Sequence, residues 1–154
     1  MLEVQRKDKR GHFIIPQAPE DAGYYVYGTP GGGAGQYAHP TMMTAILRVE
    51  REWQAIDKRK FGVGNISLAE GVKYKGHATH RSGLEVDVRP LRKDGRQVAV
   101  HWYNEEYDQA ATAKLIELFR LYSSVALIYF NDSHIPFVTH LAEHDHHFHV
   151  KLRG

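Results

Sequence analysis

Two stretches of the chain carry apolar residues at the spacing of a helix. In each of them the apolar positions recur at steps of three or four, so they share one face of a helix. These positions are Met42, Ile46, Val49, Trp53 and Ile56 in the first stretch, and Ala111, Leu115, Leu118 and Tyr122 in the second. The pattern predicts helices near residues 41–57 and 107–122, and Thr41, after Pro40, is the expected N-cap of the first.

Other stretches have the pattern of strands. Residues 84–89 alternate Leu, Val and Val with Glu, Asp and Arg, and residues 147–152 alternate His, His and Lys with Phe, Val and Leu. Each therefore has one apolar and one polar face. Residues 125–130 are continuously apolar, which predicts a central strand covered on both faces. Residues 24–27 and 97–103 are further strand candidates.

Together these elements predict an α+β fold, in which a small antiparallel sheet is flanked by the two helices. At 154 residues the chain has the length of one domain and can bury a core of its own. We see no internal repeat and no linker, so residues 1–154 are predicted to form a single domain. Residues 1–23 are charged and then interrupted by Pro and Gly, which is typical of an extended, weakly structured lead-in.

The charge balance gives little reason to expect a charged partner. The net charge is +2 with the histidines neutral, and no Lys/Arg stripe with interleaved aromatics runs along the chain, so we expect no nucleic-acid partner. No stretch approaches the ~20 apolar residues of a membrane-spanning helix, so we expect no integral membrane segment. The apolar run at residues 13–15 is shorter than the ~7–15 residues of a signal-peptide core. We therefore expect synthesis in the cytoplasm without a standard signal peptide.

Histidine is the unusual component of the composition. The chain has eleven histidines and no cysteine, and four of the histidines fall within residues 144–149. Imidazole is a poor repeated choice for a core, so this density indicates a metal or proton chemistry, or else a solvated, tag-like run. Any metal would bind His, Asp or Glu.

A metal site follows from the strands if they pair. Pairing of the strands at 84–89 and 147–152 would make Asp87 and His149 neighbours on the polar face of the sheet, and His80 would join them from the preceding loop. A catalytic zinc takes three such protein ligands and leaves its fourth position to water. The sequence therefore predicts a strand-borne zinc site on the polar face of the sheet.

Two motifs resemble a known family. Gly-His-x-x-His-x-x-Gly-Leu-x-Val-Asp at residues 76–87 and His-x-x-His-x-His-Val-x-Leu at residues 144–152 are similar to the motifs of the penicillin-insensitive murein endopeptidases. Their wider group contains lysostaphin-type peptidases, D-Ala-D-Ala metallopeptidases and the hedgehog signalling domain. The resemblance extends weakly over roughly residues 60–154 and does not include the first 40 residues. It implies a single metallopeptidase domain.

The resemblance also implies roles for individual residues. The implied zinc ligands are His80, Asp87 and His149, the implied general base is His147, and His77 and His144 would line the site and, if charged, stabilise the oxyanion. Zinc would lower the pKa of its bound water from ~15.7 toward ~7. Glu85 stands where the motif commonly has Asp, and we expect it behind the ligands or at the surface.

The implied activity is hydrolysis of an amide bond in peptidoglycan cross-links, of the D-Ala–diaminopimelate type. Arg81, Arg89 and Lys151 could bind the free carboxylates of the stem peptides. Without an export signal, such an enzyme would reach the periplasm or cell wall as a phage lysin, with a holin, or as an effector injected by a bacterial secretion machine, with an immunity protein as a further partner.

Three other functions stay open at this point. A D-Ala-D-Ala dipeptidase or carboxypeptidase of the same group would use the same ligands. A non-enzymatic zinc-binding module of hedgehog type would also share them, with a closed fourth coordination position. A metal-dependent nuclease could use a His-rich strand, but the chain lacks the basic stripe that such an enzyme needs.

Overall fold

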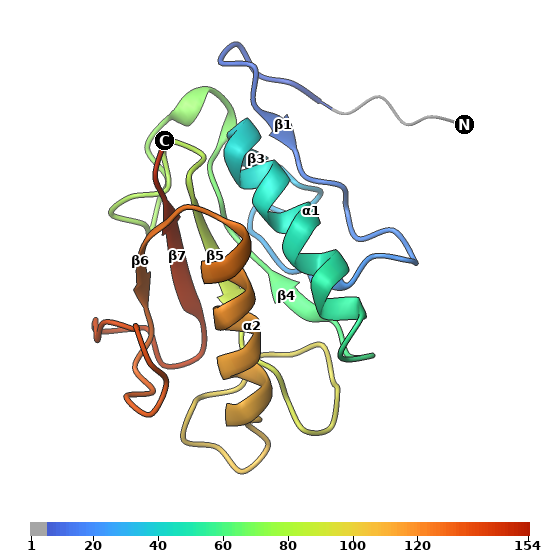
Figure 1. The fold of residues 1–154 in the computed structure, drawn as a ribbon. Coiled ribbons are helices and arrows are strands. Elements are labelled where there is room, and N and C mark those ends of the chain that lie inside the picture. The colour runs from blue at the N-terminus through green and yellow to red at the C-terminus, as the bar shows by residue number, and fades with distance from the viewer. Residues whose placement is uncertain (1–5) are drawn as a thin grey trace.

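The computed structural model describes residues 6–154, and within them the fold is α+β, as predicted (Figure 1). The prediction for residues 1–5 lies outside the described residues. In chain order the elements are β1 (Phe13–Ile14), β2 (Tyr24–Val26), β3 (Tyr37–Ala38), α1 (Pro40–Gln54), β4 (Phe61–Val63), the 3₁₀ turn η1 (Ala69–Gly71), β5 (Glu85–Arg89), α2 (Gln109–Tyr122), β6 (Val125–Tyr129) and β7 (Phe148–Leu152). Neither α-helix of this part of the chain is long and apolar enough to cross a membrane.

The main sheet has five strands in the order β2-β4-β5-β7-β6, and β1 pairs with β3 in a separate small sheet. Three of the four pairings in the main sheet are antiparallel, but β2 runs parallel to β4. The prediction of an antiparallel sheet is therefore wrong at this edge, because α1 connects β2 and β4 as a crossover. The predicted pairing of β5 with β7 is confirmed, and it places Asp87 opposite His149.

Both helices cover the same face of the main sheet (Figure 1). Their apolar stripes meet the sheet through aromatic side chains: Trp53 packs on Phe61 with ring centroids 6.3 Å apart, Phe61 on Phe119 at 6.4 Å, and Phe119 on Phe148 at 6.1 Å. All four side chains are buried, and burial of each contributes about 1.5–3 kcal/mol. The opposite face of the sheet has no helix over it among the described residues and is free to carry a site.

The lead-in is tied to this core at several points. Phe13 and Ile14 pair with β3, Lys7 bridges to Phe13, and Ile15 is fully buried. Apart from β1 and the bridge at Lys7, the described residues before β2 form turns and irregular structure.

Three local predictions are wrong. The apolar run at residues 125–130 contains β6, which lies at the edge of the main sheet and not at its centre. Ile128 and Phe130 lie in the core, whereas Leu127 and Tyr129 line a cleft on the other face. Residues 97–103 form no strand, since the Trp102 N–H donates to the Asp145 carbonyl and holds a loop. The N-cap of α1 is His39, whose Nδ1 accepts from the Thr41 N–H at 3.0 Å.

Candidate metal centre

A cleft of about 480 Å³ opens on the face of the sheet away from the helices. Strands β5, β7 and β6 form its floor, and the loops at residues 76–80 and 141–147 form its walls. Eight of the residues singled out in the sequence line it: His77, His80, Glu85, Asp87, His144, His147, His149 and Lys151. The two motifs, about 60 residues apart, are therefore two sides of one site.

One oxygen of Asp87 is the centre of the cluster. Asp87 Oδ1 lies 3.2 Å from His80 Nε2, 3.2 Å from His149 Nδ1 and 3.9 Å from His147 Nε2. The carboxylate is buried, with 6% of the residue exposed. Burial alone would raise its pKa, but the hydrogen bonds from His149 and His80 hold that pKa well below the usual range. Asp87 is thus an anion surrounded by imidazole nitrogens.

The two rings nearest to Asp87 are each anchored through their other nitrogen. His80 Nδ1 lies 3.0 Å from the Ile66 carbonyl oxygen, and His149 Nε2 lies 3.1 Å from Glu85 Oε1. A carbonyl and a carboxylate accept hydrogen bonds, so both anchored nitrogens carry a proton as donors. Metal-binding histidines are commonly oriented in this way, with the outer N–H bonded and the inner nitrogen facing the metal.

Glu85 lies behind His149 and His80, which is the first of the two positions that the sequence left open for it. It is buried, and its second oxygen accepts the backbone N–H of His80 at 2.9 Å. One carboxylate therefore fixes both a ring on β7 and the loop that carries His80. Burial would raise the Glu85 pKa, but these hydrogen bonds outweigh it and lower the pKa to about 2. The signal was present in the alternation of residues 84–89, which puts Glu85 on the same face as Asp87.

His80 itself has an unusual backbone. Its φ is 66°, in the left-handed region that residues other than glycine adopt only uncommonly. Such a conformation costs about 1–3 kcal/mol and is kept where the surroundings enforce it. Here the hydrogen bonds of its N–H to Glu85 and of its ring to Ile66 provide that enforcement.

His149 sits between two carboxylates. Burial lowers its pKa, but the hydrogen bonds to Asp87 and Glu85 outweigh this and raise the pKa to about 9. Without a metal the ring is therefore an imidazolium at neutral pH. A metal cation bound at this point would replace that proton, as metal sites built from histidine generally do.

His77 faces a different neighbour. Its Nε2 lies 2.8 Å from the amide nitrogen of Asn65, whose Oδ1 accepts the Thr29 N–H at 2.7 Å. This second bond sets the orientation of the amide, so Asn65 donates to His77 Nε2 and the proton of the neutral ring is on Nδ1. Burial, and then the neighbouring His80, lower the His77 pKa, so the ring is neutral at pH 7.

A donor atom from each of His77, His80 and Asp87 lies within 4.8 Å of the other two, and this group could hold a metal ion. His149 offers an alternative third nitrogen beside the same Asp87 oxygen. His149 is not part of the group within 4.8 Å, so the ligand set His80, Asp87 and His149 stays a prediction.

The His147 ring is neutral at pH 7, so one of its nitrogens can act as a base. Burial lowers its pKa to about 4, against the opposing effect of Asp87 and together with the nearby His144 and His146. The ring is thus unprotonated at pH 7 and can accept a proton. His144 packs against it, with ring centroids 4.8 Å apart. His146 is exposed and lies outside the cleft.

The three predicted substrate cations are in different environments. Lys151 lines the cleft, two residues along β7 from His149. The Arg81 guanidinium donates to the Gly71 carbonyl at 2.9 Å, and that of Arg89 stacks on the Tyr27 ring at 3.9 Å. Neither arginine is among the residues that line the cleft.

The fold and the site define a class: an α+β protein with a carboxylate and several imidazoles at the base of an open cleft, in an arrangement that could hold a metal ion. Comparison with family models identifies the family as well. The model for penicillin-insensitive murein endopeptidases matches residues 33–134, more than half of the chain, and the chain belongs to this family. The match includes the first motif and ends before the second. A search of curated proteins gave no match.

Family membership supports murein endopeptidase activity, and with it a peptidoglycan substrate at the cell wall. It confirms the family that the two motifs indicated.

Proposed function

We propose that the protein is a zinc-dependent endopeptidase that hydrolyses amide bonds in the peptide cross-links of peptidoglycan, of the D-Ala–diaminopimelate type. The observation that carries the proposal is the placement of Asp87 Oδ1 between two imidazole nitrogens, 3.2 Å from each, with both rings anchored on their far sides. Family membership supplies the substrate class.

The proposed ligands are His80, Asp87 and His149. Nitrogen and oxygen donors of this kind suit zinc, and each of the two rings has its inner nitrogen beside the carboxylate. His77 is the less suitable third ligand, because its Nε2 accepts the hydrogen bond from Asn65 and its Nδ1 therefore carries the proton. When bound, zinc supplies a Lewis acid and lowers the pKa of its water toward ~7.

The remaining histidines would move protons and hold charge. His147, unprotonated at neutral pH, accepts the proton of the attacking water at its ring and then returns it to the leaving amine. His77, protonated on Nδ1, can donate a hydrogen bond to the oxygen on which negative charge develops, and His144, if charged, can assist it. The buried floor of the cleft keeps these interactions strong, because little water competes with them.

Lys151 is the proposed contact for the carboxylates of the stem peptide. Residues two apart on a strand are spaced by about 6.6 Å, so the Lys151 ammonium is within reach of a carboxylate adjacent to the bond cleaved beside His149. Arg81 and Arg89 are engaged elsewhere, and we assign them no direct contact. Carboxypeptidase or dipeptidase activity of the same site is the alternative.

Delivery to the wall as a phage lysin with a holin, or as an injected effector with an immunity partner, stays a prediction from the sequence. It is independent of the chemistry proposed for the cleft.

The direct test combines metal analysis with product analysis. The purified protein should contain close to one equivalent of zinc by mass spectrometry, and it should convert cross-linked muropeptides of isolated sacculi into monomers. Products that lose only a terminal D-alanine would indicate a carboxypeptidase. Absence of bound zinc after zinc loading, together with unchanged muropeptides, would refute the proposal.

A further inference from the structure

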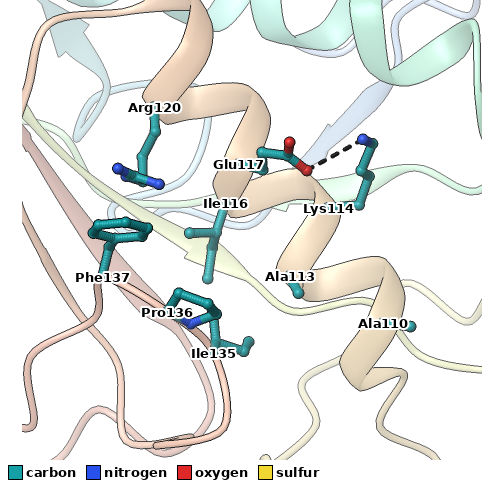
Figure 2. Close-up of a pocket in the computed structure, with 9 residues that line it drawn as sticks. All are labelled: Ala110, Ala113, Lys114, Ile116, Glu117, Arg120, Ile135, Pro136 and Phe137. Atoms are coloured by element: carbon teal, nitrogen blue, oxygen red, sulfur yellow. Dashed lines mark hydrogen bonds and ion pairs between the residues drawn. The ribbon is translucent and has the colours of Figure 1, made fainter.

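A second groove lies outside the cleft, between α2 and the loop at residues 135–137 (Figure 2). Its volume is about 390 Å³. The floor is apolar, with Ala113 and Ile116 from the helix facing Pro136 from the loop, and charged side chains stand at its rim (Figure 2). At that rim Lys114 pairs with Glu117 at 3.2 Å. The groove thus combines a flat apolar surface with polar edges.

Phe137 is the most unusual residue of this groove. It is 70% exposed, although it is a large aromatic. Its φ is 67°, which for a bulky side chain is a strained conformation with a cost of about 1–3 kcal/mol. The Arg120 guanidinium lies 3.3 Å above the ring centroid (Figure 2). The Arg120 cation therefore covers one face of the Phe137 ring, and the solvent-exposed surface is on the rest of the ring.

The groove is connected to the catalytic cleft. Arg120 and Phe137 also border a hollow of about 350 Å³ that runs along the outer edge of β6, where Arg153 contributes a further cation. This hollow shares Leu127 with the cleft that contains Asp87. The cleft, the hollow and the groove are therefore neighbours around β6, each sharing lining residues with the next.

We propose that this surface binds a glycan strand of peptidoglycan, with Phe137 as the stacking platform for a sugar ring. The proposal rests on the proposed function, because every stem peptide of that substrate is attached to a glycan strand. A peptide held in the cleft brings its own glycan strand close to the hollows that neighbour the cleft.

The chemistry of the groove fits a saccharide. A sugar ring has an apolar C–H face, which can cover the open side of an aromatic ring and the apolar floor. Its hydroxyl and acetamido oxygens accept hydrogen bonds, and Arg120 and Arg153 offer guanidinium donors along the path. The rim at Lys114 and Glu117 offers both a donor and an acceptor.

The test separates sugar binding from peptide hydrolysis. Binding is measured by co-sedimentation with insoluble glycan strands from which the peptides have been removed enzymatically. Hydrolysis is measured on intact sacculi and on a soluble, sugar-free cross-linked peptide dimer. The variants are Phe137→Gly, which removes the ring and relieves the backbone strain, Phe137→Trp, which restores an aromatic face, and the control Tyr103→Gly, which removes an aromatic that is 61% exposed outside the groove.

We expect Phe137→Gly to bind peptide-free glycan about tenfold more weakly, the factor that corresponds to about 1.4 kcal/mol. The ratio of its rate on sacculi to its rate on the dimer should fall by a similar factor. Phe137→Trp should recover most of both values, and Tyr103→Gly should match the wild type. Because glycine suits the left-handed backbone, Phe137→Gly should keep or raise the melting temperature, so a loss of binding is not a loss of folding.

Other outcomes would overturn the proposal. If the wild-type protein does not co-sediment with peptide-free glycan, the groove does not bind a glycan strand. The same conclusion follows if Phe137→Gly leaves the ratio of the rate on sacculi to the rate on the dimer unchanged. A change in sedimentation coefficient with Phe137→Gly, at unchanged glycan affinity, would make the groove an interface between copies of the chain instead. Failure to cleave the dimer would refute the proposed function alone, because glycan binding is read without any hydrolysis.

Discussion

Asp87 and His149 lie opposite each other on β5 and β7, with Asp87 Oδ1 3.2 Å from His149 Nδ1. The pairing puts residues 62 positions apart in hydrogen-bonding contact, and it brings the two histidine motifs into one cleft. Strand register fixes this contact, since a shift of either strand by one residue would turn that strand's side chain into the core. The site is thus held by the sheet and completed by loops.

Substitution of the two candidate third ligands should distinguish them. His149→Ala should lose zinc, because it opens a second coordination position beside His80 and Asp87. His77→Ala should retain zinc, because Nε2 of this ring accepts from Asn65 and Nδ1 carries the proton, and the variant should lower kcat about 10²–10³-fold through loss of an oxyanion donor. Isothermal titration with zinc measures the first effect and muropeptide release the second. The reverse pattern of zinc loss would make His77 the ligand.

Glu85→Gln should weaken zinc binding by about 10- to 100-fold, the usual effect of losing a partner that orients a ligand. The amide has only one acceptor, so it cannot accept both the His149 ring N–H and the His80 backbone N–H. Competition with a chromogenic chelator gives the affinity. Glu143→Gln is the matched control, since Glu143 is an exposed acid on the rim of the same cleft. Equal affinities for the two variants would show that Glu85 does not orient the site.

Much of this site could be predicted from residues alone. Period-two alternation predicted the polar faces of β5 and β7, and their pairing follows from the need to bury the other faces together. Glu85 was harder to assign, because alternation shows its face but not its partners. The position of His80 depends on a left-handed backbone, for which the sequence has no signal at a histidine.

The elements of the fold were also predictable only in part. Stripes of helical period predicted α1 and α2, since apolar steps of three and four over several turns line one face of a helix and would scatter over both faces of a strand. The apolar run of β6 predicted a central strand, but its side chains serve the core on one face and the cleft on the other. A run of apolar residues does not show whether the second face of a strand is covered by helices or lines an apolar cleft. The short strands β1, β3 and β4 have two or three residues, too few for a period to appear.

His147→Ala should keep zinc and lose turnover. Its Nε2 is 3.9 Å from Asp87 Oδ1, farther than the nitrogens of His80 and His149, so metal affinity should change little. Loss of a general base should lower kcat about 10²–10⁴-fold. Zinc content and cleavage of the sugar-free dimer are measured on the same sample. His140→Ala, an exposed histidine outside the cleft, should match the wild type, and full activity of His147→Ala would refute the base assignment.

Gly83→Ala should destabilise the fold by about 2–4 kcal/mol. Gly83 has φ +78°, and a Cβ there would lie 2.6 Å from the His39 backbone nitrogen and 2.9 Å from His12 Nδ1. This lack of space for a side chain explains why the first motif has glycine at position 83. Gly76→Ala is the control, because it has a similar φ of +83° but open space around the added carbon. Urea unfolding should give a clearly smaller loss for Gly76→Ala, and equal losses would show that the contact at Gly83 is unimportant.

The stability of the fold should fall in acid through Asp132, a fully buried carboxylate away from the cleft. Burial raises its pKa, but hydrogen bonds from Tyr107, at 2.6 Å, and from Gln109 and His134 outweigh this and leave the pKa lowered. A pKa that is lower in the folded state adds stability above the unfolded value of about 3.9 and loses it as the pH falls through the folded value. Urea unfolding between pH 7 and 3 should therefore show a decline below about pH 4.

Tyr107→Phe tests this assignment, because it removes the hydroxyl donor and so raises the Asp132 pKa toward its unfolded value. The variant should be less stable than the wild type at pH 7, by about 1–3 kcal/mol, and the difference should shrink in acid, where the protonated carboxyl no longer needs the donor. Tyr103→Phe removes a hydroxyl from an exposed ring and should follow the wild type at every pH. A Tyr107→Phe difference that stays constant from pH 7 to 3 would mean that Asp132 does not contribute to acid unfolding.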